Sequence, residues 1–235
     1  MKMVRLIRYF ALRMSLLIVV FLLIVGSSSG EPATIICGPY PQRAQTDSVV
    51  ISWMTVTPTS RNEVHWGESL ACSTITCKQN LVPRILHSVR LQGLTAAHQY
   101  YYQVISDGAE SPLYTFWTAF PRNETIRFAV YGDSQGEWDG WQMVLKIAQA
   151  IEQERPLFVL KTGDLVDKGW NRTHWIAYFT ASSFLHNSTL YPVLGNHENQ
   201  SSLYFSYFSL PFNERWYSFV NGPVHFIGLD SNRPD

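Results

Sequence analysis

The sequence predicts an all-β sandwich over residues 31–120, followed by an α/β domain over residues 121–235. Three observations lead to this fold class. The first half alternates apolar and polar residues between closely spaced turn residues, which is typical of small β-sandwiches. The second half alternates apolar runs with segments of helical period, which indicates a parallel sheet with crossover helices. Three of those runs end at a glycine followed by Asp or Asn, which places polar side chains at one edge of the sheet.

The composition is that of a folded chain without a charge bias. Hydrophobic residues make up 46% of the 235 residues and charged residues only 15%, so the chain can bury a core. Lys and Arg together number 18, as do Asp and Glu. Because there is no basic excess, we expect no nucleic-acid partner.

The N-terminus has the pattern of a secretory signal peptide over residues 1–30. Basic residues precede the apolar run 16–25, and small residues follow it. We therefore expect a secreted or periplasmic protein. The run is shorter than the roughly 20 residues of a membrane span. An uncleaved N-terminal anchor is the alternative, and it would be the only contact with a membrane. The basic residues are Lys2, Arg5, Arg8 and Arg13.

Export would permit disulfide bonds between the cysteines. Cys72 and Cys77 enclose only four residues, and we expect them to form a local disulfide. Cys37 would then remain as a buried thiol or pair with a cysteine outside this chain. None of the three has the spacing of a zinc site.

The first domain is expected to consist of short strands. Val49, Ile51 and Trp53 alternate along one face of the first strand. The other predicted faces are Val64 and Trp66; His87, Val89 and Leu91; Tyr100, Tyr102 and Val104; and Tyr114 and Phe116.

The stretch 94–104 resembles the tyrosine corner of fibronectin type III-like domains. In that motif the hydroxyl of Tyr100 would bond back to the backbone. Ala96 stands where the family often has proline, so the match is incomplete. Because no cluster of polar catalytic residues occurs here, we expect a fibronectin III-like module without catalytic function.

The second domain begins with a predicted strand over 126–131. Apolar residues then recur at helical spacing until Pro156, which ends the helix before the next strand. A second helix is expected over 170–184, and a third strand precedes Gly195. A hairpin over 216–229, with Asn221-Gly222 at its turn, follows. The apolar residues of the first helix are Trp141, Val144, Leu145, Ala148 and Ile151.

Three loops carry the chemistry of this domain. They are Gly132-Asp133-Ser134-Gln135-Gly136, Gly163-Asp164-Leu165-Val166-Asp167 and Gly195-Asn196-His197-Glu198. Unpaired carboxylates are costly where strands end in a core, so their convergence indicates a metal cluster. Each aspartate taken singly is also compatible with a helix N-cap.

In this order the loops resemble those of the calcineurin-like metallophosphoesterases. The first domain, with Gly38-Pro39-Tyr40-Pro41-Gln42-Arg43 near its start, resembles the N-terminal domain of purple acid phosphatases. The resemblance implies an exported phosphoesterase that hydrolyses phosphate esters with a metal-bound hydroxide at a dinuclear site. The cofactors would be two divalent ions, Mn, Zn, Fe or Mg.

The resemblance also implies a role for each loop residue. Asp164 would bridge the two metal ions, with Asp133, Gln135 and Asn196 as further ligands. Asn196 and His197 would contact the substrate. His197 would protonate the leaving group, and Asp167 would orient His197. Glu198 is expected to bond the loop backbone rather than a metal.

The sequence departs from the family pattern in three ways. Gln135 stands where the commonest pattern has histidine, and Asp167 stands where purple acid phosphatases have tyrosine, so we expect no purple colour. No Gly-His-x-His occurs, so the domain is expected to be the incomplete N-terminal half, with little metal affinity or activity. The alternative function is an exported binding module with a catalytically dead phosphoesterase scaffold. A nuclease is less favoured, because no basic groove is visible.

Overall fold

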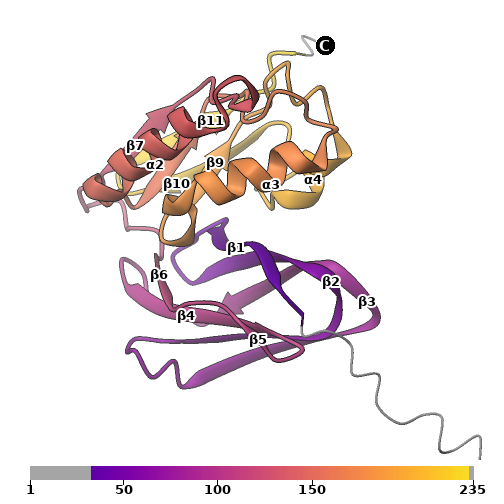
Figure 1. Ribbon diagram of the computed structural model, residues 1–235. Coiled ribbons are helices and arrows are strands. Elements are labelled where there is room, and N and C mark those ends of the chain that lie inside the picture. The colour runs from indigo at the N-terminus through magenta and orange to yellow at the C-terminus, as the bar shows by residue number, and fades with distance from the viewer. Residues whose placement is uncertain (1–32, 233–235) are drawn as a thin grey trace, which may run out of the picture. The chain divides into compact units, whose positions relative to one another are not determined.

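The computed structural model describes residues 33–232, which form a β-sandwich followed by an α/β region (Figure 1). The fold class predicted from the sequence is thereby confirmed. The expected signal peptide lies outside the described residues. None of the helices in the described part has the length and apolarity needed to cross a bilayer.

A long bent hairpin organises the sandwich. The sequence predicted separate short strands, but the structure joins the first two into β2, which has 20 residues. β3 pairs along one edge of β2, while β1 and β4 pair with successive parts of the opposite edge. Register shifts between Met54 and Arg61 interrupt the ladder midway. The strands are β1 (Ile35–Gln42), β2 (Ser48–Gly67), β3 (Thr74–Gln92), β4 (Gln99–Ser106), β5 (Ala109–Glu110) and β6 (Tyr114–Trp117).

The sandwich core consists of the side chains that alternate inward. The hydroxyl of Tyr100 bonds back to the backbone, as expected from the tyrosine corner. It accepts a hydrogen bond from the N–H of Thr95 at 2.9 Å. Trp53 donates its indole N–H to the hydroxyl of Ser106 at 2.8 Å, so the largest core side chain is also paired. The buried core residues predicted by alternation are Val49, Ile51, Trp53, Val64, Val89, Leu91, Tyr100, Tyr102, Val104 and Phe116.

His87 is held as a neutral imidazole within the sandwich. Its Nε2 lies 3.1 Å from the hydroxyls of both Thr55 and Thr59. Those hydroxyls donate to Thr57 O and Asn62 Oδ1, so they accept from Nε2–H and leave Nδ1 bare. Nδ1 is buried and has no partner within residues 33–232. Burial, supported by the charge of nearby Lys78, lowers the pKa of His87 to about 4.

Acid should therefore destabilise the sandwich through His87. A histidine whose folded pKa is depressed contributes its full stability above its unfolded pKa of about 6.5 and loses it as the pH falls towards 4. We expect the free energy of unfolding to fall by on the order of 1–3 kcal/mol over that window. His87→Gln should flatten this part of the curve in urea titrations, and His225→Gln, at an exposed position, should not. Identical curves for both variants would contradict the assignment.

The α/β region contains three parallel strands in the order β7-β8-β9. Phe128 pairs with Phe158, which pairs with Thr189, so the strands end in register at one edge of the sheet. The three loops therefore leave the sheet from the same edge, as the sequence predicted. The elements are β7 (Phe128–Tyr131), η1 (Glu137–Asp139), α2 (Gln142–Glu154), β8 (Phe158–Lys161), α3 (Arg172–Ala181), η2 (Ser183–His186), β9 (Thr189–Pro192), α4 (Ser202–Tyr207), β10 (Tyr217–Asn221) and β11 (Val224–Gly228).

Two details of this region differ from the sequence prediction. Asn221 pairs with Val224, so the hairpin loop is Gly222-Pro223, one residue later than predicted. Gly222 adopts a φ of 58°, a conformation that glycine enters without steric cost. The short helix α4 was not predicted, because its aromatic-rich sequence gives no helical period over so few residues.

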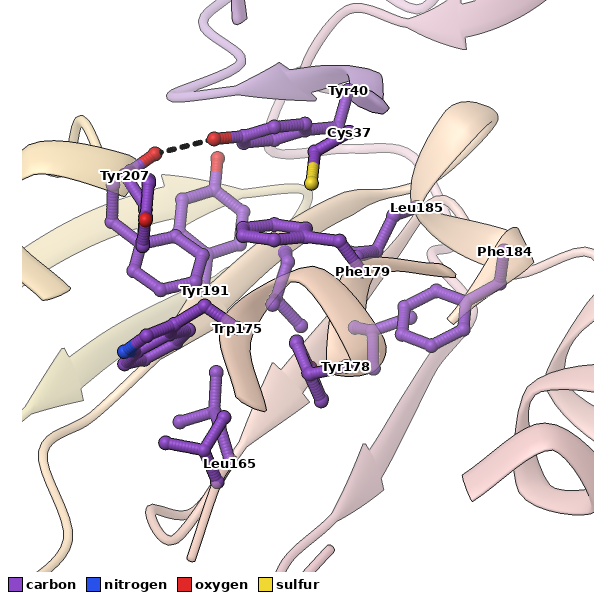
Figure 2. Close-up of a cluster of buried hydrophobic side chains, with 14 of the residues drawn as sticks. Cys37, Tyr40, Leu165, Trp175, Tyr178, Phe179, Phe184, Leu185, Tyr191 and Tyr207 are labelled. Atoms are coloured by element: carbon purple, nitrogen blue, oxygen red, sulfur yellow. Dashed lines mark hydrogen bonds between the residues drawn. The ribbon is translucent and has the colours of Figure 1, made fainter. Parts of the chain in front are cut away.

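The core of the α/β region extends to the first strand of the sandwich. Trp175, Tyr178 and Phe179 of α3 are buried in it (Figure 2). Tyr40 of β1 stacks on Phe179 with ring centroids 4.9 Å apart, and its hydroxyl donates to the carbonyl of Tyr207 at 2.7 Å. These contacts bring Tyr40 into the core of the α/β region, while the sandwich keeps a separate core of its own.

The predicted disulfide is not formed. Cys72 and Cys77 are free thiols, as is the buried Cys37. The intervening residues do not form a closed loop, because β3 begins at Thr74 and runs extended through Cys77. A Cβ built on Gly67 would lie 3.4 Å from Cys72 Cα, whereas Cys77 pairs with Glu63, further along β2. Four steps along a strand span about 13 Å, so the two cysteines lie beyond the reach of a disulfide. Burial raises the pKa of the Cys37 thiol to about 12, which keeps it protonated and unreactive.

Candidate metal centre and active site

The three loops meet around Asp164. The backbone N–H of Ser134, in the first loop, donates to the carbonyl of Asp164 at 2.9 Å. The N–H of His197, in the third loop, donates to the Asp164 carboxylate at 3.0 Å. The second loop therefore lies between the other two, and its carboxylate is already turned towards the third.

Asp133 and Asp164 share an unusual backbone conformation. Their φ angles are 48° and 52°, in the left-handed region that side-chain-bearing residues seldom adopt. Such residues cost on the order of 1–3 kcal/mol and occur preferentially at functional sites. Two of the four residues assigned to the metal ions from the sequence therefore leave their strands in the same backbone conformation.

Gly195 allows the third loop to approach Asp164. A Cβ atom built on Gly195 would lie 2.0 Å from Asp164 Oδ1 and 2.3 Å from its backbone nitrogen. Gly163 has a φ of +89° and faces the backbone of Gly195. A Cβ atom built on Gly163 would lie 2.9 Å from the Cα of Gly195. Any larger residue at 195 would displace the carboxylate, so both glycines are required by close packing.

Glu198 holds the second and third loops together. Its buried carboxylate accepts hydrogen bonds from the N–H groups of Asp164, Leu165, Val166 and Gly195, at 2.8–3.3 Å. Burial raises the pKa of Glu198 above its usual range, and these donors oppose the shift. The expectation that Glu198 bonds the loop backbone is confirmed.

Lys161 is a site residue that sequence analysis missed. Its buried ammonium group donates to the carbonyls of Gly163 and Asp164 and lies 5.0 Å from the centre of the Tyr131 ring. Burial lowers the pKa of Lys161 to about 8, against the opposing charges of Glu198, Asp133 and Asp164. The sequence does contain a signal for it. Lys161 directly follows the apolar run 157–160, at a position where a buried strand is expected to continue.

His197 is oriented by Asp167, but not through the carboxylate. The Nδ1–H of His197 donates to the backbone carbonyl of Asp167 at 2.9 Å. The Asp167 carboxylate instead accepts from the N–H groups of Gly136 and Glu137, at 3.1 and 2.9 Å. Asp167 thus contacts His197 through its backbone carbonyl, because its carboxylate is already held by the first loop.

The candidate ligands remain accessible at this edge of the sheet. Asp133, Asn196 and His197 are exposed, and Gln135, Asp164 and Asp167 are partly exposed. All four candidate ligands, namely Asp133, Gln135, Asp164 and Asn196, offer oxygen atoms. Oxygen donors suit hard divalent cations such as Mn²⁺ and Mg²⁺.

Comparison with known families defines the class of this protein. Residues 126–232 match the calcineurin-like phosphoesterase family, and residues 40–118 match the purple acid phosphatase N-terminal domain. The chain thus combines a calcineurin-like phosphoesterase domain with a purple acid phosphatase N-terminal domain. No curated protein sequence matches the chain significantly.

Among the solved structures that resemble this fold are a purple acid phosphatase and PhoD. The purple acid phosphatase PPD1 from yellow lupin (Lupinus luteus) seeds is 18% identical, with a TM-score of 0.64, over 80% of this chain and 43% of its own. PhoD is 14% identical, with a TM-score of 0.62, over 84% of this chain and 51% of its own. The chain therefore spans about half the length of these structures, and at this identity the likeness establishes the fold alone.

Proposed function

We propose that the protein is a metal-dependent phosphoesterase whose site is centred on Asp164. The observation that carries this proposal is the convergence of three loops on Asp164. Ser134 contacts its backbone carbonyl, and His197 contacts its carboxylate. The match to the calcineurin-like phosphoesterase family supports the same reaction class. Phosphate esters are accordingly the proposed substrates.

The residues present fit two divalent metal ions. Asp164 would be shared by both ions, Asp133 and Gln135 would bind the first, and Asn196 would bind the second. When bound, the ions would neutralise the phosphoryl charge and lower the pKa of a water molecule. The amide ligands Gln135 and Asn196 add no negative charge, which preserves the positive field for an anionic substrate.

His197 would provide the proton for the leaving group. Because its Nδ1–H is engaged by the Asp167 carbonyl, its ring orientation is fixed and Nε2 is left to face the substrate. In the protonated imidazolium, Nε2–H can donate to the departing oxygen as the P–O bond breaks. The exposed position of His197 permits this exchange of protons with water.

Hydrolysis of two substrates with different leaving groups tests this role. The assay uses the protein as its complete gene encodes it, with Mn²⁺ added. His197→Ala should lower kcat for an alkyl phosphate about 10²–10⁴-fold, because alkoxide needs a proton to leave. The loss for p-nitrophenyl phosphate should be clearly smaller, since nitrophenolate leaves without one. His225→Ala is the matched control. Equal losses for both substrates would contradict an acid role for His197.

A further inference from the structure

A second group of metal-ligating side chains lies beside the proposed centre. We propose that Glu137, Asp167 and His174 bind a third divalent transition-metal ion, of the Zn²⁺ class. Each residue offers one ligand atom, and these atoms all lie within 4.8 Å of one another. This site goes beyond the proposed phosphoesterase function, because none of these residues belongs to the ligand set around Asp164.

The side chains of the group lie close together but make no direct hydrogen bonds to one another. His174 Nε2 lies 3.6 Å from Glu137 Oε1, and His174 Nδ1 lies 3.8 Å from Asp167 Oδ2. Both separations exceed the roughly 2.7–3.2 Å of an N–H···O hydrogen bond. Two ligands bound at about 2.1 Å to one tetrahedral ion lie roughly 3.4 Å apart. The two distances are to different nitrogens of the ring, so the exposed Glu137 side chain must turn towards Nδ1 to complete a single site.

His174 supplies the independent evidence for a missing ligand. Its side chain is only 8% exposed, and Nδ1 has no hydrogen-bond partner among residues 33–232. The ring packs edge-on against Trp141, with centroids 6.0 Å apart, so it cannot turn freely towards water. A buried polar atom without a partner costs about 1–3 kcal/mol. A metal ion bound at Nδ1, beside Asp167 Oδ2, would satisfy it.

The carboxylate of Asp167 is fixed for this role. Its Oδ2 accepts hydrogen bonds from the backbone N–H groups of Gly136 and Glu137. Hydrogen bonds of this kind orient carboxylates that bind metals. Since His197 uses only the carbonyl of Asp167, the carboxylate is not engaged by the proposed acid.

Bound metal would connect three separate elements. Glu137 lies in η1 after β7, Asp167 ends the loop after β8, and His174 lies in the first turn of α3. The ion would therefore tie the loop that carries Gln135 to a helix of the core. Its proposed role is to hold that loop in place. A mixed set of one imidazole and two carboxylates favours Zn²⁺ over Mg²⁺ or Ca²⁺.

Lys168 competes with the proposed ion. Its ammonium group lies 2.8 and 3.0 Å from the two Glu137 carboxylate oxygens. Both side chains of this pair are nearly half exposed, so the ion pair is weak and can open. Removing the Lys168 ammonium group should free Glu137 for the metal. Substitution of Lys168 should therefore strengthen Zn²⁺ binding, whereas substitution of a ligand should weaken it.

Zinc binding to the complete protein tests the proposal. The measurements use isothermal titration calorimetry in an Asp164→Asn background, so that ions at the proposed dinuclear centre contribute less. Adding His174→Gln should remove one equivalent of bound Zn²⁺ or raise its Kd by at least about tenfold. Glu137→Gln, at an exposed position, should also raise the Kd, and Lys168→Met should lower it severalfold.

His225→Gln should leave Zn²⁺ binding unchanged, and thermal melts should show that each variant is folded. Unchanged binding in His174→Gln and Glu137→Gln, or weaker binding in Lys168→Met, overturns the proposal. Because zinc binding is measured without substrate, this result is separate from whether the protein hydrolyses phosphate esters.

Discussion

Replacing Asp164 with Asn should abolish phosphate-ester hydrolysis while leaving the protein folded. Asn keeps an oxygen that can accept the N–H of His197, so the contact between the second and third loops survives. It removes the negative charge that would be shared by two cations, which is worth several kcal/mol in such reactions. We therefore expect kcat/KM to fall by about 10³-fold or more.

The measurement compares initial rates at several Mn²⁺ concentrations. Asp47→Asn is the control, since Asp47 is an exposed aspartate of the sandwich. Asp164→Asn should also require much more Mn²⁺ for half-maximal activity. If Asp164→Asn retained the parent rate and the parent Mn²⁺ dependence, Asp164 would not be the shared ligand. The binding-module alternative would then gain support.

Replacing Glu198 with Ala should have the largest effect on stability. The carboxylate is fully buried and accepts from four backbone N–H groups of two loops. Each donor left without a partner costs about 1–3 kcal/mol, although water entering the gap would satisfy some of them. We expect the free energy of unfolding to fall by roughly 3–5 kcal/mol in total.

Urea unfolding followed by tryptophan fluorescence would measure this loss. Glu154→Ala is a matched control, because the Glu154 side chain is 73% exposed and its pair with Arg127 is long, at 3.7 Å. The control should change stability by less than about 0.5 kcal/mol. A similar, small change in both variants would show that Glu198 does not hold the loops. Glu198→Ala should also lose activity, because Asp164 is no longer positioned.

The sequence predicted the parts of the fold that depend on the periodicity of apolar residues and on the order of strands and helices along the chain. Alternation identified Val49, Ile51 and Trp53 as buried, and the order of strands and helices placed three loops at one edge of a parallel sheet. It could not predict that two short apolar faces belong to one 20-residue strand, β2. That continuity depends on pairing with three other strands, which local pattern does not contain.

For the site, the sequence identified residues better than their contacts. Asp133, Asp164 and His197 were found because each follows a glycine or ligand at the end of an apolar run. The sequence identified Asp167 as the residue that orients His197 but not the atom that makes the contact, because a carbonyl and a carboxylate of one residue cannot be distinguished from sequence. Lys161 was missed because a buried lysine is rare and only its tertiary partners explain it.

We propose that two cations, held by the three loops, share the carboxylate of Asp164. Anomalous diffraction from crystals of the complete protein grown with Mn²⁺ would locate the ions directly. We expect two anomalous peaks that both lie within bonding distance of the Asp164 carboxylate. Ions bound only elsewhere, with none at Asp164, would contradict it.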